Sequence, residues 1–333
     1  MKRDLTDPRS AADGRDLEAG LKEPVVENLE IPERLGPVTL VVDDHKVKRF
    51  AFTQDDHHPW HLVGSPFGHR IGHATVLAND LVQLFTTRYA ASRTVGLHTE
   101  EQLWFDSPVR VGEQVTLDGE YVESYHRRGQ GYVVMEARAR GEDGRSIIRH
   151  RGVEILRTVP GRIAGRSSTD GAGGDARTVT GEVDESLPPV RAAGPGLVPG
   201  TGLVPLAKEI TQEQASVFSR CGEYVRNIHN DLGIAREGGL PIPIVQGQQQ
   251  CDLVAELLTR FFGTRWFTGG WLRTKFIRPV EVFEPLEVGG SVHAVEGNQV
   301  ELDVWVRRGD GRLSTVGWAR CPFGVEDEKK EGA

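Results

Sequence analysis

The sequence predicts an α+β protein built from two similar domains, each with a curved antiparallel sheet wrapped around one buried helix. The first observation is an internal repeat: Phe-x-x-Pro-Val followed by an alternating strand occurs at 105–117 and again at 276–288. A strand, a Gly-Asp-Gly-Arg-like turn and a second strand occur at 137–155 and again at 304–323. The shared order, and the shared offset of about 170 residues, indicate a duplicated domain.

The helix of each half follows from the spacing of its apolar residues. Large apolar side chains recur mainly at helical spacing in "HATVLANDLVQLFTTRYAA" (73–91) and in "QGQQQCDLVAELLTRFFG" (246–263). Both segments are so rich in apolar residues that we expect each helix to be buried on most sides. Alternating runs such as "GYVVMEARA" and "QVELDVWVR", separated by Gly-containing turns, predict the antiparallel strands that cover each helix.

Composition divides the chain further. Residues 161–202 are rich in Gly, Ala, Ser, Pro and charge and have almost no large apolar residues, so we expect a linker there. Residues 1–30 lack the apolar core of a secretory signal and are expected to form a flexible lead. The two domains are then 31–160 and 203–325, followed by a charged tail at 326–333.

The overall composition restricts the class of protein. With 38% hydrophobic and 26% charged residues among 333, and no apolar run of roughly 18 residues, the chain resembles a soluble globular protein without a membrane span. A formal net charge of −8 argues against general nucleic-acid binding, which needs a basic face. Cys221, Cys251 and Cys321 have no metal-type spacing, so we expect a reducing cytoplasm, with Cys221 and Cys251 as small core residues.

The most informative motif lies in the first half, where five of the eleven histidines fall between 57 and 73. "FTQDDHHPWH" resembles the signature Phe-(x)n-Asp-x-Asn-Pro-x-His of the (R)-specific enoyl-CoA hydratase, or MaoC-like, branch of the hot-dog fold. Asp56, Pro59 and His61 are in register, and His58 stands where the family has Asn. "RIGHATVL" resembles the family's Ile-Ala-His-Gly turn before the central helix, with Ala74 at the glycine. The resemblance covers nearly all of the chain outside the lead and linker, and implies a double hot-dog fold.

The second half keeps other parts of the same signature. His229 matches the motif histidine, and "PIVQG" ends in Gly247, which matches the turn glycine. Tyr224 stands where the family has Asp, and Glu223 can replace that Asp only if the loop is one residue longer. The two halves therefore form either one site or two.

The resemblance implies syn addition of water to an α,β-unsaturated acyl thioester, or the reverse. A carboxylate and an imidazole can activate the water and deliver the proton, because burial can move the pKa of either towards neutrality. By resemblance Asp56 and His61 form this pair, and we favour them as the working site over His229. The remaining candidates are expected to bind the thioester oxygen or to shape its pocket: His58, His73, Ala74, Asn227 and Gly247. No metal or redox cofactor is implied, and the substrate is expected to be an acyl-CoA or acyl-carrier-protein thioester.

Simpler interpretations compete at several positions. Asp56 alone suits a loop or helix cap, and the spacing to Pro59 and His61 is what favours catalysis. His57/His61 and His69/His73 are each four residues apart, which would align metal ligands on a helix, but Pro59 and the nearby glycines argue against a continuous helix there. Asp55 is expected to be a solvated neighbour, Trp60 to pack, and Asn227 and Asp231 to order the loop around His229.

Two rival functions remain open. The first is a hot-dog thioesterase, in which a carboxylate activates water against the carbonyl carbon; the Asp-x-x-Pro-x-His spacing favours the hydratase. The second is a non-catalytic acyl-binding subunit, which the departures at His58, Ala74 and Tyr224 favour. Since one chain already contains the domain pair, we expect a monomer or a homodimer.

Overall fold

The computed structural model describes residues 18–91, 96–127, 129–156, 177–219 and 226–324. The strands of the first half are β1 (Glu33–Val42), β2 (Leu97–Phe105), β3 (Glu113–Arg127), β4 (Gln130–Gly141) and β5 (Ser146–Leu156). Those of the second half are β6 (Leu206–Glu209), β7 (Trp271–Phe276), β8 (Pro285–Glu296), β9 (Gln299–Arg308) and β10 (Leu313–Pro322).

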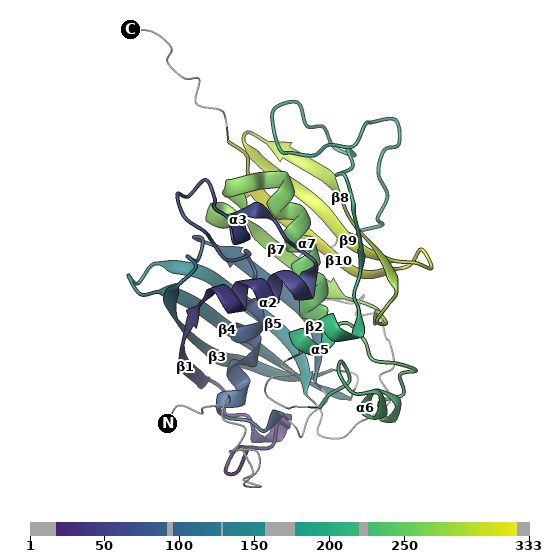
Figure 1. The fold of residues 1–333 in the computed structure, drawn as a ribbon. Helices are drawn as coiled ribbons and strands as arrows, with labels where there is room; N and C mark the ends of the chain where they lie inside the picture. The colour runs from purple at the N-terminus through teal and green to yellow at the C-terminus, as the bar shows by residue number, and fades with distance from the viewer. Residues whose placement is uncertain (1–17, 92–95, 128, 157–176, 220–225, 325–333) are drawn as a thin grey trace.

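The helices lie mainly on one side of these strands (Figure 1). The α-helices are α2 (Asp44–Gln54), α3 (Pro59–Leu62), α4 (Ala78–Val82), α5 (Gln212–Phe218), α6 (Leu232–Glu237), α7 (Gly247–Phe262) and α8 (Trp266–Gly269). Three further segments are 3₁₀-helical: η1 (Val26–Asn28), η2 (Gln83–Thr87) and η5 (Gly263–Arg265).

The order of strands in the sheet reflects the internal repeat of the sequence. Its ten described strands form one sheet in the order β1-β3-β4-β5-β2-β7-β10-β9-β8-β6, so the order of the first half is repeated in reverse by the second. Antiparallel pairing of β2 with β7, from Glu100↔Lys275 to Trp104↔Trp271, joins the two halves. The repeated sequences 105–117 and 276–288 both run from the end of one central strand into the next strand. The predicted α+β double hot-dog fold is confirmed.

The predicted central helix of the second half is α7. Fourteen of its sixteen residues are buried, as expected for a helix enclosed on most sides. Its apolar residues belong to one hydrophobic core that also contains Leu81 and Leu103 of the first half. The core is therefore continuous across the two halves.

The predicted long helix over 73–91 is wrong. The chain there makes turns, the five-residue α4 and the 3₁₀-helix η2, although the apolar residues are buried as expected. Thr86 and Thr87 donate their hydroxyl groups to the carbonyls of Gln83 and Leu84, three residues earlier. Such local bonds, together with the weak helix preference of Asn, Asp and Thr, favour tight turns over a regular helix.

The helix α2 was not predicted, and it directly precedes the histidine motif. Asp43 begins it by accepting a hydrogen bond from the backbone N–H of Lys46 at 2.7 Å. It ends at Asp55, whose backbone is left-handed with φ of 50°. This turn directs the following residue back towards the protein interior.

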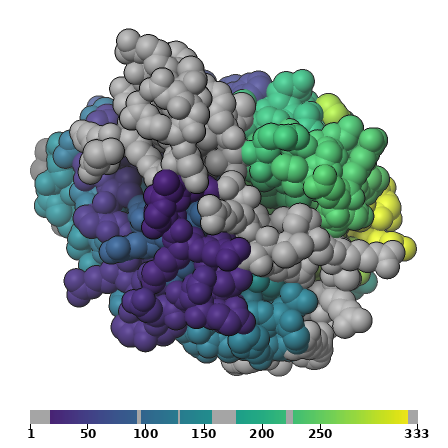
Figure 2. Space-filling model, turned by 90° about the horizontal axis from the view of Figure 1, so that it is seen from below, coloured from purple at the N-terminus to yellow at the C-terminus, as the bar shows by residue number. Residues whose placement is uncertain are grey.

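The predicted linker, N-terminal lead and C-terminal tail are only partly described by the structure. Residues 161–176 of the expected linker lie outside the described residues. Residues 177–202 contain several turns, and Val179 packs on Trp305 and Trp318. The lead up to residue 17 and the predicted tail also lie outside the described residues. Seen from below, α6 and the N-terminal segment lie on the same face (Figure 2). None of the described helices is long and apolar enough to cross a membrane.

The continuous core gives a stability prediction. Leu258 of α7 is completely buried, so Leu258→Ala should lower the free energy of unfolding by about 2–5 kcal/mol. Circular dichroism and tryptophan fluorescence should follow one common transition, because the core is shared by both halves. Val63→Ala is the control, since Val63 is 80% exposed and should change stability by less than about 0.5 kcal/mol. Two separate transitions in the native chain would contradict a shared core.

Candidate active site

The left-handed turn at Asp55 places the side chain of Asp56 inside the protein. The N–H of Asp56 donates to the carbonyl of Ala51, which closes the end of α2. Asp56 is only 4% exposed, whereas Asp55 is exposed and lies 3.5 Å from the exposed ring of His57. One carboxylate of the pair is thus buried and the other is solvated, as the sequence predicted.

The short helix α3 orients His61. Pro59 occupies its first turn, and His58 precedes it as the N-cap residue. The N–H of His58 donates to Asp56 Oδ1 at 3.2 Å, so Asp56 also orders the loop, as the capping alternative proposed. The ring of His61 is 1% exposed, and its Nδ1 lies 3.0 Å from the carbonyl of Ile71. A proton on Nδ1 satisfies this carbonyl and leaves Nε2 as a proton acceptor.

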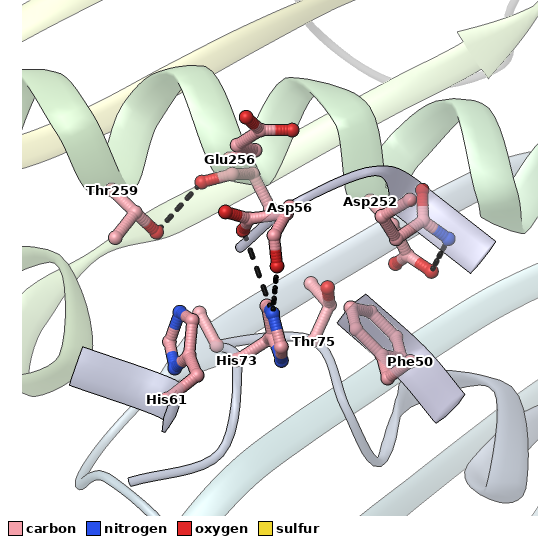
Figure 3. A pocket seen from close by; sticks show the side chains of 11 residues that line it. Phe50, Asp56, His61, His73, Thr75, Asp252, Glu256 and Thr259 are labelled. Carbon is pink, nitrogen blue, oxygen red and sulfur yellow. Dashed lines mark hydrogen bonds and ion pairs between the residues drawn. The ribbon is translucent and has the colours of Figure 1, made fainter. Parts of the chain in front are cut away.

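His73 completes a cluster of three buried side chains. Its ring stacks on that of His61, with ring centroids 3.7 Å apart. Its Nε2 lies 3.0 Å from the backbone oxygen of Asp56 and 3.7 Å from Asp56 Oδ2 (Figure 3). One potential ligand atom from each of the three residues lies within 4.8 Å of the others.

The electrostatic environment keeps both imidazoles neutral at neutral pH. Burial lowers the pKa of His61, and the charge of Asp56 opposes that shift. Burial and the neighbouring His61 lower the pKa of His73 to about 3. A neutral imidazole beside a carboxylate is a competent proton acceptor.

The polar residues of α7 form the opposite wall. Asp252, Ala255, Glu256 and Thr259 line the same small cavity as Asp56 and the two histidines (Figure 3). Burial raises the pKa of Asp252 well above its usual range, and one of its oxygens accepts a hydrogen bond from Gln248 at 2.9 Å. The free volume of the cavity is about 10 Å³, the space of roughly one water molecule.

Glu256 is the second carboxyl group of this wall. Burial, and then the charge of Asp56, raise its pKa to about 7. It pairs with Lys208 at 2.7 Å and with Arg260 at 2.7 Å. Sequence reasoning missed Asp252 and Glu256, although a signal was present: residues 248, 252, 256 and 260 are all polar at spacing four, in a helix whose other residues from 251 to 262 are apolar except Thr259.

Side chains of the second half hold the loop that carries Asp56. Gln214 donates to the carbonyl of Phe52 at 2.9 Å, and Gln249 donates to that of Thr53 at 2.9 Å. Lys208 donates to the next two carbonyls, at 3.0 and 2.8 Å. The bonds to Thr53, Gln54 and Asp55 satisfy carbonyl groups that the end of α2 leaves without helical partners. The bond to Phe52 adds to the one that the N–H of Asp55 already donates at 3.3 Å.

The other first-half candidates are only partly as predicted. Ala74 and the adjacent Thr75 line the cavity, and the backbone of Ala74 is outside the left-handed region, so alanine fits there. However, the turn does not open a long helix, because α4 begins only at Ala78. His57 and His69 do not align with His61 and His73 on a helix, since α3 spans only Pro59–Leu62. The absence of a metal at this cluster stays a prediction.

The second-half candidates lie apart from the cavity. His229 Nδ1 is 2.7 Å from the carbonyl of Ile244, which parallels the bond of His61, and burial lowers its pKa to about 4. Asn227 accepts from the N–H of His229 at 2.8 Å, and Asp231 caps α6, so both order this loop. Gly247 is the first residue of α7. None of these four residues lines the cavity at Asp56.

Packing against Phe276 explains the glycine at 247. A Cβ atom at Gly247 would lie 2.8 Å from the ring of Phe276, so close packing requires glycine there. Cys221, Glu223 and Tyr224 lie outside the described residues, so the position of the second-half acid stays a prediction.

Comparison with known proteins finds a similar fold among solved structures. Neither protein-family models nor curated sequences match this chain. A structure described as a MaoC-like dehydratase has a TM-score of 0.70 at 15% identity, covering 90% of this chain and all of the other. A MaoC domain dehydratase from Chloroflexus aurantiacus J-10-fl has a TM-score of 0.65 at 11% identity, covering 92% and 99%. A conserved hypothetical protein from Mycobacterium tuberculosis has a TM-score of 0.60 at 15% identity, covering 90% and 98%. The last is described as a double hotdog fold, and the chain shares this fold.

The pKa of Glu256 predicts how stability depends on pH. Folded Glu256 keeps its proton up to a pH of about 7, whereas an unfolded glutamate releases it near 4.3. The folded state binds more protons in this interval, so the free energy of unfolding should fall as the pH rises through it. Glu256→Gln removes the titrating carboxyl group and, with it, this dependence on pH. Its stability relative to the native chain should therefore rise by about 3 kcal/mol between pH 4 and pH 7.5.

Urea unfolding at a series of pH values measures this difference. Glu142→Gln is a matched control because Glu142 is an exposed turn residue, and its stability difference should stay constant with pH. A constant difference for Glu256→Gln as well would show that the Glu256 carboxyl titrates normally.

Proposed function

We propose that the chain is a hydratase or dehydratase of α,β-unsaturated or 3-hydroxy acyl thioesters, with Asp56 and His61 as its acid–base pair. The observation that carries the proposal is a buried carboxylate and a neutral imidazole lining a cavity of about one water molecule. The structural neighbours described as MaoC-like dehydratases support the same reaction class.

In this proposal each group has a role that its position supports. The bond from His61 Nδ1 to Ile71 leaves Nε2 to accept a proton from water, while Asp56 holds that water by Oδ2, the oxygen that does not bond His58. The oxygen adds to Cβ of the substrate, and the electron pair of the double bond moves towards the thioester carbonyl. The protonated member of the pair then delivers a proton to Cα, which restores the charge of the site. We assign the carbonyl oxygen to the backbone N–H groups of the turn at Ala74 and Thr75.

The remaining features of the function are proposed on the same basis. Proton transfer within the Asp56/His61 pair requires no redox cofactor and no metal. The substrate is an acyl-CoA or an acyl-carrier-protein thioester, and the working protein is a cytoplasmic monomer or homodimer. In this proposal His58 shapes the pocket, since its ring packs edge-on against Trp60 with centroids 4.8 Å apart.

The residues at the cavity favour the hydratase over its two rivals. A thioesterase needs a group that activates water, but it does not need a second group to protonate carbon. Here a carboxylate and an imidazole both face the cavity. A binding subunit has no need to bury three titratable side chains, which carries a cost in free energy.

Incubation with crotonyl-CoA distinguishes the three functions. The hydratase removes the enoyl absorbance without releasing thiol, and this is the result that we expect. Release of free thiol would establish a thioesterase. Saturable binding without turnover would establish an acyl-binding subunit.

Substitution of the pair tests the assignment of residues. Asp56→Asn and His61→Ala should each reduce kcat at least about a hundredfold, because each removes an acid–base group. His57→Ala is the matched control: His57 belongs to the same loop but is exposed, and its rate should stay within about twofold of native. Circular dichroism verifies that the variants fold. Near-native rates in both catalytic variants, with a large loss in His229→Ala, would instead place the site in the second half.

A further inference from the structure

A second buried cluster of titratable groups lies on the inner face of the sheet, away from the Asp56 cavity. It consists of His98 and Glu101 on β2 and His150 on β5. Glu101 Oε2 lies 2.9 Å from His98 Nε2 and 3.1 Å from His150 Nε2. Glu101 is 0% exposed and His150 is 2% exposed. The proposed hydration uses none of these residues.

The backbone is shaped to bring the three side chains together. Residues three apart on a regular strand point to opposite faces. The pairing of β2 with β5 shifts register between His98 and Glu100, and this bulge allows His98 and Glu101 to meet on one face. Gly152 lies opposite Glu101, and a Cβ atom there would approach His150 Nε2 to 2.9 Å. A bulge and a glycine thus both make room for the cluster.

The cluster has unused ligand capacity. Within the described part of the chain, Glu101 Oε1 and His150 Nδ1 are buried and have no hydrogen-bond partner. His98 Nε2 is close to Glu101 Oε2 but makes no hydrogen bond of acceptable geometry. Leaving such groups unsatisfied in a protein interior is costly. A ligand that accepts electron pairs from Glu101 and from the Nε2 atoms of the two histidines would remove the part of that cost that falls on Glu101 and His98.

Distances and donor types indicate what this ligand is. Metal bonds of about 2.0–2.2 Å to imidazole nitrogen and carboxylate oxygen place neighbouring ligand atoms roughly 3–3.5 Å apart. The two distances from Glu101 Oε2 are close to this range. Two imidazoles and one carboxylate are a donor set for a divalent transition metal. Glu154, directly opposite His98, adds a half-buried acidic group whose interactions with His98 and His150 would favour a nearby cation.

We propose that His98, Glu101 and His150 form a binding site for a divalent transition metal ion of the zinc class. The ion ties β2, the strand that joins the two halves, to β5, and its role is to stabilise the sheet. This assignment departs from the expectation, drawn from the sequence, that the chain uses no metal.

Titration of the chelator-treated full chain with Zn²⁺ tests the site. Competition with a chromophoric chelator should give one tightly bound Zn²⁺ per chain. Glu101→Gln and His98→Gln should each weaken this binding at least about a hundredfold, because each removes a ligand. His98→Gln is the milder variant, since the side chain of His98 is 12% exposed. His61→Gln is the matched control and should retain the tight site, because His61 belongs to a separate group of potential ligands, with Asp56 and His73.

Two further readouts make the test decisive. Zn²⁺ should raise the melting temperature of the native chain and of His61→Gln, but not that of His98→Gln. Co²⁺ in place of Zn²⁺ should give a visible absorption band that the Glu101 and His98 variants lose. Absence of stoichiometric Zn²⁺ binding by the native chain would overturn the proposal. Binding that His61→Gln abolishes and His98→Gln preserves would also overturn it, and would place the metal at the Asp56 cluster.

Discussion

The hydrogen bonds from the second half to the carboxyl end of α2 are the constraint on which the Asp56 site depends. A helix leaves its last carbonyl groups without partners, and burying them unpaired is costly. Gln249 and Lys208 satisfy three such carbonyls in succession, from Thr53 to Asp55, and Gln214 adds a second bond to that of Phe52. The chain can then turn sharply at Asp55 and bury Asp56. The first half supplies the acid–base pair, but the second half fixes its position, so the duplicated chain forms this site as one unit.

The helix α7 connects this constraint to the core. Its apolar residues pack into the shared hydrophobic core, while Asp252 and Glu256 line the cavity. Lys208 bonds both the α2 loop and Glu256, so it joins the loop directly to the helix. Because α7 serves the core and the cavity together, the first half does not need a long central helix of its own. This division of roles explains how the segment 73–91 can be turns and short helices while the fold remains a double hot-dog.

The sequence predicts the features that depend on local pattern. The strand pairs, their turns and α7 follow from alternation and helical periodicity, and the repeat predicts that they occur twice. The motif spacing brings Asp56 and His61 to one cavity. Periodicity fails over 73–91, because the burial of apolar residues there is real but Thr86 and Thr87 satisfy nearby carbonyls in tight turns. It also cannot predict Lys208 or Gln249 as partners of α2, since those contacts join residues more than 150 positions apart.

The charges around the cavity explain why burial there favours acid–base chemistry. Burial raises the pKa of Asp252 and lowers that of His73 to about 3, so in both groups burial favours the uncharged form beside the pair. Lys208 and Arg260 balance Glu256, the remaining acidic group of the wall. His61 is therefore neutral beside the carboxylate of Asp56, with few other charges to screen their interaction with a water molecule. Neighbouring titratable groups in unlike environments adopt unlike protonation states, which is the condition for dividing proton acceptance and proton donation between them.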